Sequence, residues 1–369
     1  MRGPQAPRAV EPPNRLRPQV AAYPGAVPQP APTSRATRQP PGAWPPARLH
    51  VVTGKGGTGK STVAAALALA LAAGGRRSLL VEVEGRQGIA QLFDTAPLPY
   101  QERRIAVAPG GGEVRALAVD PEDALLEYLE MFYNLRRAGR MLKRAGAIDF
   151  ATTAAPGLRD VLLIGKVKEA TTRIADGRRV YDAVVLDAPP AGRIGRFLNV
   201  TAEVAGLARV GPIKTQSEGV TALLKSTQTA IHFVTVLEEM PVQETADAVA
   251  ELRGLAMSLG TVLVNMTRPP LLPAASLSRA AAGRLDTAKL RAGLAAAGLP
   301  AAYADGLAAE ARDHALRVGL EAENRLTVDE LGLPSYDLPL LAGPVDLGAL
   351  YELAGLLSDQ GVGRPEPTG

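Results

Sequence analysis

The sequence of 369 residues contains no cysteine. That absence excludes a disulfide framework, an iron–sulfur cluster and a zinc site built from thiolates, and it is typical of a cytoplasmic protein. Histidine is scarce too, and His50, His232 and His314 lie far apart in the chain. We therefore expect structural roles for the three histidines, and we expect any bound metal to be a hard cation held through oxygen ligands.

Hydrophobic runs long enough for a membrane are also missing. The longest purely apolar run, Val63 to Ala73, has eleven residues, whereas a membrane-spanning helix needs about 20. The N-terminus lacks the apolar core of a signal peptide. These features predict a cytoplasmic protein, with peripheral contact to a membrane left open.

Lysine is rare, with eight lysines against thirty-three arginines. The charge is also unevenly distributed. Residues 1–46 hold six arginines and one acid, so they carry +5, and the remaining residues carry −1 of the total formal charge of +4. A nearly neutral folded part offers no broad surface for nucleic acid, and we expect no nucleic-acid partner. Because thirteen of the thirty-one prolines also fall in residues 1–46, we expect a disordered extension there.

Short apolar runs that alternate with helical patterns predict a parallel sheet covered on both faces. Right-handed crossovers then give an α/β fold with a doubly wound, mostly parallel sheet. The first helix is expected at Ser61 to Ala73. The expected strands are residues 49–53, 78–83, 114–119, 181–186, 231–237, 261–264 and 335–340.

The domain organisation follows from the same patterns. We expect one domain over residues 47–360, followed by a frayed tail at 361–369. Two helical insertions, at about 121–176 and 197–229, are expected to form a helical subdomain. A third alanine-rich stretch, 274–331, is amphipathic and ends before a glycine.

A glycine-rich segment lies between the first expected strand and the first expected helix. Its sequence is a full match to G-x-x-x-x-G-K-[ST]: Gly54-Lys55-Gly56-Gly57-Thr58-Gly59-Lys60-Ser61-Thr62. Glycines let the backbone wrap phosphates, and the helix adds its N-terminal N–H groups. Lys60 is expected to reach the β- and γ-phosphates and Ser61 to ligate Mg²⁺. The segment predicts a P-loop that binds ATP with Mg²⁺.

Lys55 adds a second positive charge to this loop. The order Lys-Gly-Gly-x-Gly-Lys-Ser-Thr resembles the variant loop of one branch of P-loop proteins. In that branch the first lysine reaches across a dimer interface to the partner's phosphates. A cation supplied in trans in this way can contribute about 10³–10⁵ in rate. The resemblance implies a dimer in which Lys55 acts on the partner's nucleotide.

The strand at residues 181–186 runs into Asp187-Ala188-Pro189-Pro190-Ala191-Gly192. This segment resembles the D-T-A-P-T-G-H switch of the arsenite-pump and tail-anchored-protein targeting ATPases, where the glycine also lies five residues after the aspartate. Septum-site ATPases place it four residues after, which argues against that branch. The resemblance implies that Asp187 belongs to the magnesium site.

Further segments are similar to the same family. Residues 233–245 resemble its E-x-M-P-x-x-E-T element, and the strand ending at Asn265 resembles the one whose asparagine contacts adenine. The resemblance covers roughly residues 48–360. The segment Glu82 to Gly88 is similar to an actinobacterial subgroup whose members pair with a paralogue, which implies a homodimer or a heterodimer with such a paralogue.

The sequence departs from the family at three points. The first switch of the family reads S-T-D-P-A-H, and Glu84 stands at the position of its water-positioning aspartate. A misplacement of about 1 Å can cost on the order of 10²-fold, so hydrolysis by this chain alone is an open question. The interfacial C-x-x-C of the eukaryotic targeting factors is absent. A thiol-based metalloid site is excluded for the same reason.

The resulting hypothesis is an ATP-hydrolysing dimeric switch that handles a hydrophobic client or a membrane partner. The client groove or the ordinary helical core is expected to contain Met131, Phe132, Tyr133, Met141, Leu142, Leu162, Leu163 and Ile164. One alternative is a non-hydrolysing regulatory subunit of a heterodimeric ATPase. Another is a partition-type ATPase that acts on DNA or membrane.

Overall fold

The computed structural model describes residues 44–133, 156–199 and 212–363. Within them an eight-stranded sheet has the order β10-β9-β8-β1-β7-β2-β4-β3, and every neighbouring pair except β3–β4 is parallel. The strands are β1 (Leu49–Gly54), β2 (Arg77–Glu82), β3 (Arg103–Ala108), β4 (Gly112–Ala118), β7 (Ala183–Asp187), β8 (Thr229–Thr235), β9 (Leu259–Thr267) and β10 (Ser335–Pro339). The predicted mostly parallel α/β sheet is confirmed.

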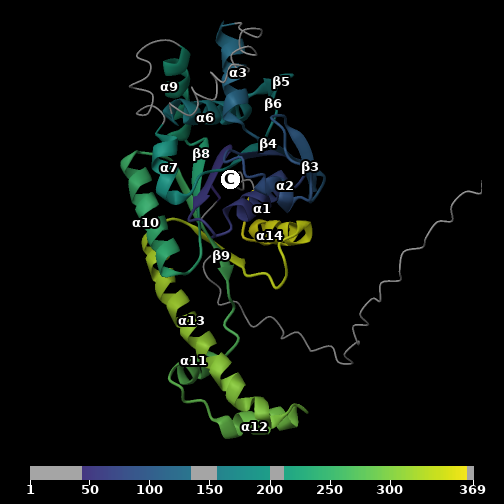
Figure 1. Ribbon diagram of the computed structural model, residues 1–369, viewed down its shortest axis with the longest axis vertical. Coiled ribbons are helices and arrows are strands. Elements are labelled where there is room, and N and C mark those ends of the chain that lie inside the picture. Colours follow the sequence, from purple (N-terminus) through teal and green to yellow (C-terminus); the bar gives the residue numbers. More distant parts are fainter. Residues whose placement is uncertain (1–43, 134–155, 200–211, 364–369) are drawn as a thin grey trace, which may run out of the picture. The chain divides into compact units, whose positions relative to one another are not determined.

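Two hydrophobic cores cover the two faces of this sheet. Successive strand residues point to opposite faces, so Val51 packs in one core and Val52 in the other. Helices α1 (Lys60–Ala72) and α14 (Leu347–Asp359) cover the face of Val52. Helices α7 (Ala191–Leu198) and α10 (Glu239–Gly254) cover the face of Val51 (Figure 1). The chain is therefore doubly wound.

The sequence patterns missed the strands that have little apolar character. Edge strand β3 is antiparallel to β4 and begins with two exposed arginines, so it lacks a buried apolar run. The helical insertion expected through about residue 176 ends earlier, at Thr172, because Ile174–Ala175 (β5) pairs with Arg178–Arg179 (β6). Asp176 and Gly177 both have positive φ, 52° and 72°, which is the geometry of a tight hairpin turn.

Helices from the two predicted insertions pack against one another. Helix α6 (Pro156–Thr172) contacts both α3 (Pro121–Tyr133) and α9 (Pro212–Leu224), and the three lie together in Figure 1. The remaining parts of the insertions, residues 134–155 and 200–211, lie outside the described residues. Short helix α2 (Gly88–Leu92) follows β2 and packs on α1.

The third helical stretch forms α11 (Ala274–Ala281), α12 (Thr287–Ala296), a single 3₁₀ turn (Ala301–Tyr303) and α13 (Ala304–Glu330). Helix α13 packs on α11 and α10, and it ends before Gly332, whose φ is 66°. His314 of α13 accepts a hydrogen bond from the Leu271 amide, 3.0 Å away. Among all the helices described, none combines the length and apolar character needed to cross a membrane.

The fold begins before the expected boundary at residue 47. Trp44 is buried and stacks on His232, with ring centroids 4.7 Å apart, and on His50 at 5.7 Å. His50 Nδ1 lies 3.0 Å from His232 Nε2, and His232 Nδ1 lies 2.9 Å from the hydroxyl of Thr261. Burial lowers the pKa of both histidines, that of His50 to about 4, so both are neutral at pH 7. Residues 44–46 thus belong to the fold, while the rest of the expected extension lies outside the described residues.

The first residues of the expected tail, 361–363, also belong to the fold. The Val362 side chain is buried among residues of α1 and α14, and the carbonyl of Gly363 accepts a hydrogen bond of 2.6 Å from Arg76. Residues 361–363 therefore pack on the fold. Residues 364–369 lie outside the described residues.

We expect Trp44→Ala to lower the free energy of unfolding by about 3 kcal/mol, because it removes a buried ring and exposes the histidine pair. Trp44→Phe keeps a ring in the stack and should lose less. Urea unfolding followed by circular dichroism measures both, since Trp44 is the only tryptophan of the chain and its fluorescence disappears in the variants. Equal stability of Trp44→Ala and the wild type would contradict this account of the N-terminal boundary.

Candidate functional site

The glycine-rich segment forms the loop between β1 and α1, and two of its glycines are required by close contacts. A Cβ on Gly54 would lie 2.1 Å from the carbonyl oxygen of Val234, and one on Gly59 would lie 2.4 Å from Asn265 Nδ2. Above Gly56 and Gly57 the space is open. The loop is therefore tight on the side of the sheet and open on the other.

The N-terminus of α1 is free to bind an anion. No side chain caps its first amide groups, and its first turn contains no acidic residue. Lys60 stands at this terminus and has no ion-pair partner within the described part of the chain. Unpaired N–H groups, the helix dipole and a free ammonium together favour a phosphate. This is where the sequence predicts the β- and γ-phosphates.

Lys55 is engaged within its own chain. Its ammonium forms a hydrogen-bonded ion pair with the carboxylate of Glu244 on α10, and both side chains are half-buried. The Lys55 carbonyl accepts a 2.9 Å hydrogen bond from the Thr58 hydroxyl, which closes the turn of the loop. Glu244 belongs to the E-x-M-P-x-x-E-T element, but its pairing with Lys55 could not be predicted from the sequence.

Asp187 and Ser61 meet at the carboxyl end of the sheet. The Ser61 hydroxyl donates a 2.5 Å hydrogen bond to Asp187 Oδ2. Asp187 is 8% exposed, and its other oxygen, Oδ1, is buried without a hydrogen-bond partner. No group of three carboxylate or imidazole side chains in the described residues forms a closed metal cage. A hydroxyl beside an orphaned carboxylate oxygen fits Mg²⁺ that completes its shell with phosphate and water.

The buried position of Asp187 disfavours its ionised form. Its pKa is raised from the ordinary value of 3.8 to about 6, chiefly because burial disfavours the carboxylate. The Ser61 hydrogen bond and the charge of Lys60 oppose this shift, while Glu82 and Glu84 add to it. The site therefore holds more negative charge than its own hydrogen bonds neutralise, which is typical of a place that receives a cation.

Sequence reasoning missed Glu82. This acid ends β2 directly beside Asp187 at the end of β7, in register with it, and is 4% exposed. Its Oε1 accepts a hydrogen bond of 3.1 Å from the amide of Gly88, and its Oε2 is buried without a partner. The available signal was an acid that directly follows the apolar run Leu79 to Val81.

Glu84, the predicted water-positioning residue, lies near the same carboxylates. Its side chain is largely buried, and its oxygens lie 3.9 Å from Arg86 and 3.8 Å from Arg193. Arg193 follows the segment that begins at Asp187, so this pair links the two expected switch segments. The second segment is also anchored to β1, because the Thr53 hydroxyl donates a 2.7 Å hydrogen bond to the Pro189 carbonyl.

Asn265 contacts the loop from β9. Its amide Nδ2 donates a 2.9 Å hydrogen bond to the Thr58 carbonyl, and the residue is buried. In the structure Asn265 supports the loop beside Gly59, while its contact with adenine stays a prediction. Thr62, on the first turn of α1, is half-buried next to Ser61.

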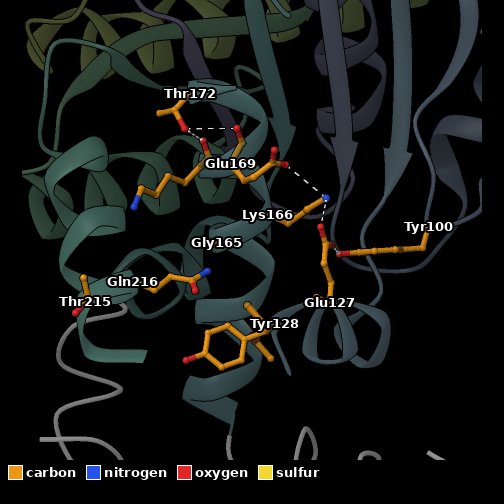
Figure 2. Close-up of a pocket in the computed structure, with 12 residues that line it drawn as sticks. Tyr100, Glu127, Tyr128, Gly165, Lys166, Glu169, Thr172, Thr215 and Gln216 are labelled. Atoms are coloured by element: carbon orange, nitrogen blue, oxygen red, sulfur yellow. Dashed lines mark hydrogen bonds and ion pairs between the residues drawn. The ribbon is translucent and has the colours of Figure 1, made fainter. Parts of the chain in front are cut away.

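A separate cavity of about 330 Å³ lies among α3, α6 and α9 (Figure 2). Of the expected groove residues Leu162, Leu163 and Ile164, all three are buried in the core, and Leu162 also lines the cavity. The side chains expected at 131–133, 141 and 142 lie outside the description. The other lining residues are Tyr100, Ala124, Glu127, Tyr128, Gly165, Lys166, Lys168, Glu169, Thr172, Thr215 and Gln216.

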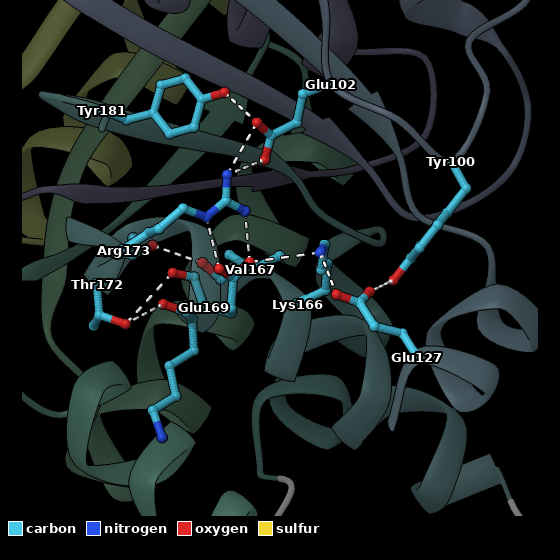
Figure 3. Close-up of polar contacts among 11 residues, drawn as sticks. Tyr100, Glu102, Glu127, Lys166, Val167, Glu169, Thr172, Arg173 and Tyr181 are labelled. Atoms are coloured by element: carbon cyan, nitrogen blue, oxygen red, sulfur yellow. Dashed lines mark hydrogen bonds and ion pairs between the residues drawn. The ribbon is translucent and has the colours of Figure 1, made fainter. Parts of the chain in front are cut away.

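A chain of alternating charges begins in the wall of this cavity, where Glu127, Lys166 and Glu169 lie, and it ties the helices to the sheet (Figure 3). Lys166 forms ion pairs with Glu127 at 2.8 Å and with Glu169 at 3.5 Å. Arg173 forms ion pairs with Glu169 at 2.6 Å and with Glu102 at 2.8 Å. At the two ends, the hydroxyl of Tyr100 donates a hydrogen bond to Glu127, and that of Tyr181 donates one of 2.5 Å to Glu102. The network joins α3 and α6 to Glu102, just before β3, and to Tyr181, two residues before β7. Cation and anion alternate along it, so the wall carries little uncompensated charge.

Comparison with known proteins gives consistent matches. A sequence profile described as anion-transporting ATPase matches residues 47–224. ATPase BagA of Mycobacterium tuberculosis is 58% identical over 318 residues, which cover 85% of this chain and 94% of that protein. ATPase get3 of Schizosaccharomyces japonicus is 26% identical over 46% of this chain and 51% of its own length. An arsenical pump-driving ATPase of Acidiphilium multivorum is 25% identical over 59% of this chain and 39% of its own length.

We expect Asp187→Asn to stabilise the nucleotide-free, metal-free protein in a pH-dependent way. A carboxyl whose folded pKa is about 6 rather than 3.8 destabilises the fold fully above pH 6, and the penalty disappears as the pH falls toward 4. The gain should therefore be on the order of 2–3 kcal/mol at pH 8 and vanish near pH 4. Thermal unfolding in EDTA across this range measures it. A gain that does not change with pH would contradict the strained carboxylate.

Proposed function

The chain belongs to the anion-transporting ATPase family, and from this premise we propose that it is an ATP-hydrolysing switch that works as a dimer. The observation that carries the proposal is the open glycine loop, where the N-terminus of α1 is uncapped and Lys60 forms no ion pair with any described residue. An accessible group of unpaired N–H donors beside a free ammonium is the arrangement that binds a strong anion. ATP supplies such an anion.

We assign the nucleotide contacts to the loop itself. The amides of Gly56, Gly57 and Gly59 surround the phosphates, Lys60 neutralises the β- and γ-phosphates, and Asn265 holds the loop and faces the base. Ser61 and Asp187 hold Mg²⁺, with Thr62 beside them. When bound, Mg²⁺ neutralises charge that develops on the phosphates during transfer.

Glu84 is assigned as the residue that orients the attacking water. One of its carboxylate oxygens accepts a hydrogen bond from the water, while Arg86 and Arg193 hold the side chain. The glutamate is one methylene longer than the aspartate of the family motif, so the arginine contacts carry the positioning. The alternative, a non-hydrolysing regulatory subunit, is favoured if these contacts hold Glu84 away from the water.

The dimer is the element that activates Lys55. In the single chain Lys55 is bound to Glu244, so its ammonium must leave this partner before it contacts nucleotide across an interface. The partner is a second copy or a paralogous chain. Exchange of the Glu244 contact for a phosphate contact makes association depend on ATP.

The client part of the proposal is supported by the cavity among α3, α6 and α9. Ala124, Leu162 and the ring of Tyr128 give it apolar surface beside the charged wall, and we propose that it receives a hydrophobic peptide or a membrane protein. The chain would then be a cytoplasmic protein that reaches the membrane through such a client. The lack of cysteine argues against a metalloid cargo held by thiolates. A partition-type ATPase acting on DNA is disfavoured by the nearly neutral charge outside residues 1–46. Mass spectrometry of molecules that copurify with the chain tests the client directly.

Lys60→Ala should reduce ATP affinity at least 100-fold, because it removes the free cation at the phosphate position, while the thermal unfolding temperature stays close to that of the wild type. Isothermal titration calorimetry with Mg²⁺ and ATP measures the affinity. Lys289→Ala on α12 is the control, since this lysine is exposed and far in sequence from the loop. Unchanged ATP binding in Lys60→Ala would overturn the assignment of the site.

Lys55→Ala and Glu244→Gln are expected to shift association in opposite directions. Loss of the lysine should leave ATP affinity of the monomer nearly intact, but it should weaken ATP-dependent association and lower ATP hydrolysis by the dimer by about 10³. Loss of the Glu244 charge frees Lys55 and should strengthen ATP-dependent association several-fold. Sedimentation velocity with and without Mg²⁺ and ATP, alone and with the paralogue, measures association, and phosphate release under the same conditions measures hydrolysis. Full activity of the Lys55→Ala dimer would exclude a role in trans.

A further inference from the structure

Glu82 and Asp187 are direct neighbours on parallel strands. The residues are in register at the last positions of β2 and β7. Neighbouring strands lie about 4.8 Å apart, and residues in register point to the same face. The two carboxylates therefore emerge side by side at the edge of the sheet where α1 begins.

Each carboxylate has one oxygen that is satisfied and one that is not. The Gly88 amide donates to Glu82 Oε1 at 3.1 Å, and the Ser61 hydroxyl donates to Asp187 Oδ2 at 2.5 Å. Glu82 Oε2 and Asp187 Oδ1 are buried and have no hydrogen-bond partner in the described structure. Buried polar atoms without partners are rare because each is costly. Two on adjacent carboxylates indicate a missing positive partner.

The nearby protein cations do not supply that partner. Arg86 and Arg193 are directed to Glu84, with contacts of 3.9 and 3.8 Å. Lys60 lies close enough to affect Asp187, but it forms no ion pair with either carboxylate. If Lys60 neutralised both Glu82 and Asp187, it could not also bind the phosphates. The unmet negative charge thus belongs to the pair of Glu82 and Asp187.

We propose that Glu82, Asp187 and the Ser61 hydroxyl form a divalent-cation site that is filled before nucleotide binds. Two carboxylates and a hydroxyl are oxygen ligands of the kind that Mg²⁺ and Mn²⁺ prefer, with water completing the shell. One carboxylate and one hydroxyl would need phosphate oxygens to hold the ion. The second carboxylate, from Glu82, removes that requirement. The inference rests on the proposed function only in sharing Asp187 and Ser61 with the magnesium site of the nucleotide.

The consequence is an ordered loading of the site. A cation already bound beside Ser61 presents positive charge to incoming phosphates, together with Lys60. It also joins the end of β2 to the end of β7 before nucleotide arrives. Nucleotide-free protein should then be more stable with the cation than without it, because the cation binds the folded chain only.

The test uses the full chain, freed of nucleotide and metal, with Mn²⁺ as the probe. Electron paramagnetic resonance counts free Mn²⁺ during a titration and should show one bound ion per chain. Glu82→Gln should weaken binding at least tenfold, because it keeps the shape of the side chain and removes its charge. Glu82→Asp, which keeps the charge, should restore part of it. Glu113→Gln is the matched control, since Glu113 is a strand carboxylate that pairs with Arg115.

Each outcome decides the question. No Mn²⁺ binding by the nucleotide-free wild type, or equal binding by Glu82→Gln, would overturn the proposal and leave a proton shared by the two carboxylates as the explanation. Circular dichroism confirms that the variants are folded. Parallel titration with ATP separates this inference from the proposed function. If Mn²⁺ binds only after ATP is added, the inference is wrong and the proposed function stands. If Mn²⁺ binds but ATP never does, the proposed function is wrong and the inference stands.

Discussion

The register of three parallel strands is the constraint on which the site depends. β7 lies between β1 and β2, with Val52 opposite Asp187 and Asp187 opposite Glu82. This alignment brings the end of β1, where the glycine loop starts, to the same edge of the sheet as both carboxylates. A shift by one residue would turn these side chains to the other face. The buried cores on both faces prevent such a shift, since every strand residue would then exchange cores.

The charges at this edge are arranged at a cost to stability. Among the described residues Lys60 forms no ion pair, and one oxygen of Glu82 and one of Asp187 are buried without a hydrogen-bond partner. In the network from Glu102 through Arg173 to Lys166, by contrast, each charged side chain contacts a partner of opposite charge. Functional sites commonly keep such unpaired groups because a ligand supplies the missing partner. The unpaired groups at the sheet edge therefore indicate a binding site, whereas the paired charges of the network hold the helices together.

Lys55, the lysine that we propose to act across a dimer, is held by a contact within its own chain. The Lys55–Glu244 pair joins the loop to α10, so the state of the loop and the position of α10 are coupled in one chain. Replacement of this internal partner by phosphate requires that α10 release the side chain. The cost of breaking a half-buried ion pair is modest, which suits a contact that forms and breaks in each cycle.

The local features of the chain were predictable from the sequence. The loop motif, the helix after it and seven parallel strands follow from apolar periodicity and glycine spacing, because each depends on residues close together in the chain. Strand β3 was not predicted, because an exposed edge strand with Arg103 and Arg104 needs no apolar pattern. The burial of Trp44 was not predicted either, because its partners His50 and His232 come together only when β1 and β8 are neighbours.

The sequence by itself thus determined that the chain has a phosphate loop, an α/β sheet and an aspartate at the end of a strand. Only the tertiary structure decided that Glu82 stands beside that aspartate and that Glu244 holds Lys55. Both contacts join residues more than 100 positions apart. Their formation depends on strand order and on helix packing. Neither is encoded in a local pattern, because side chains so distant in sequence meet only when the whole sheet has assembled.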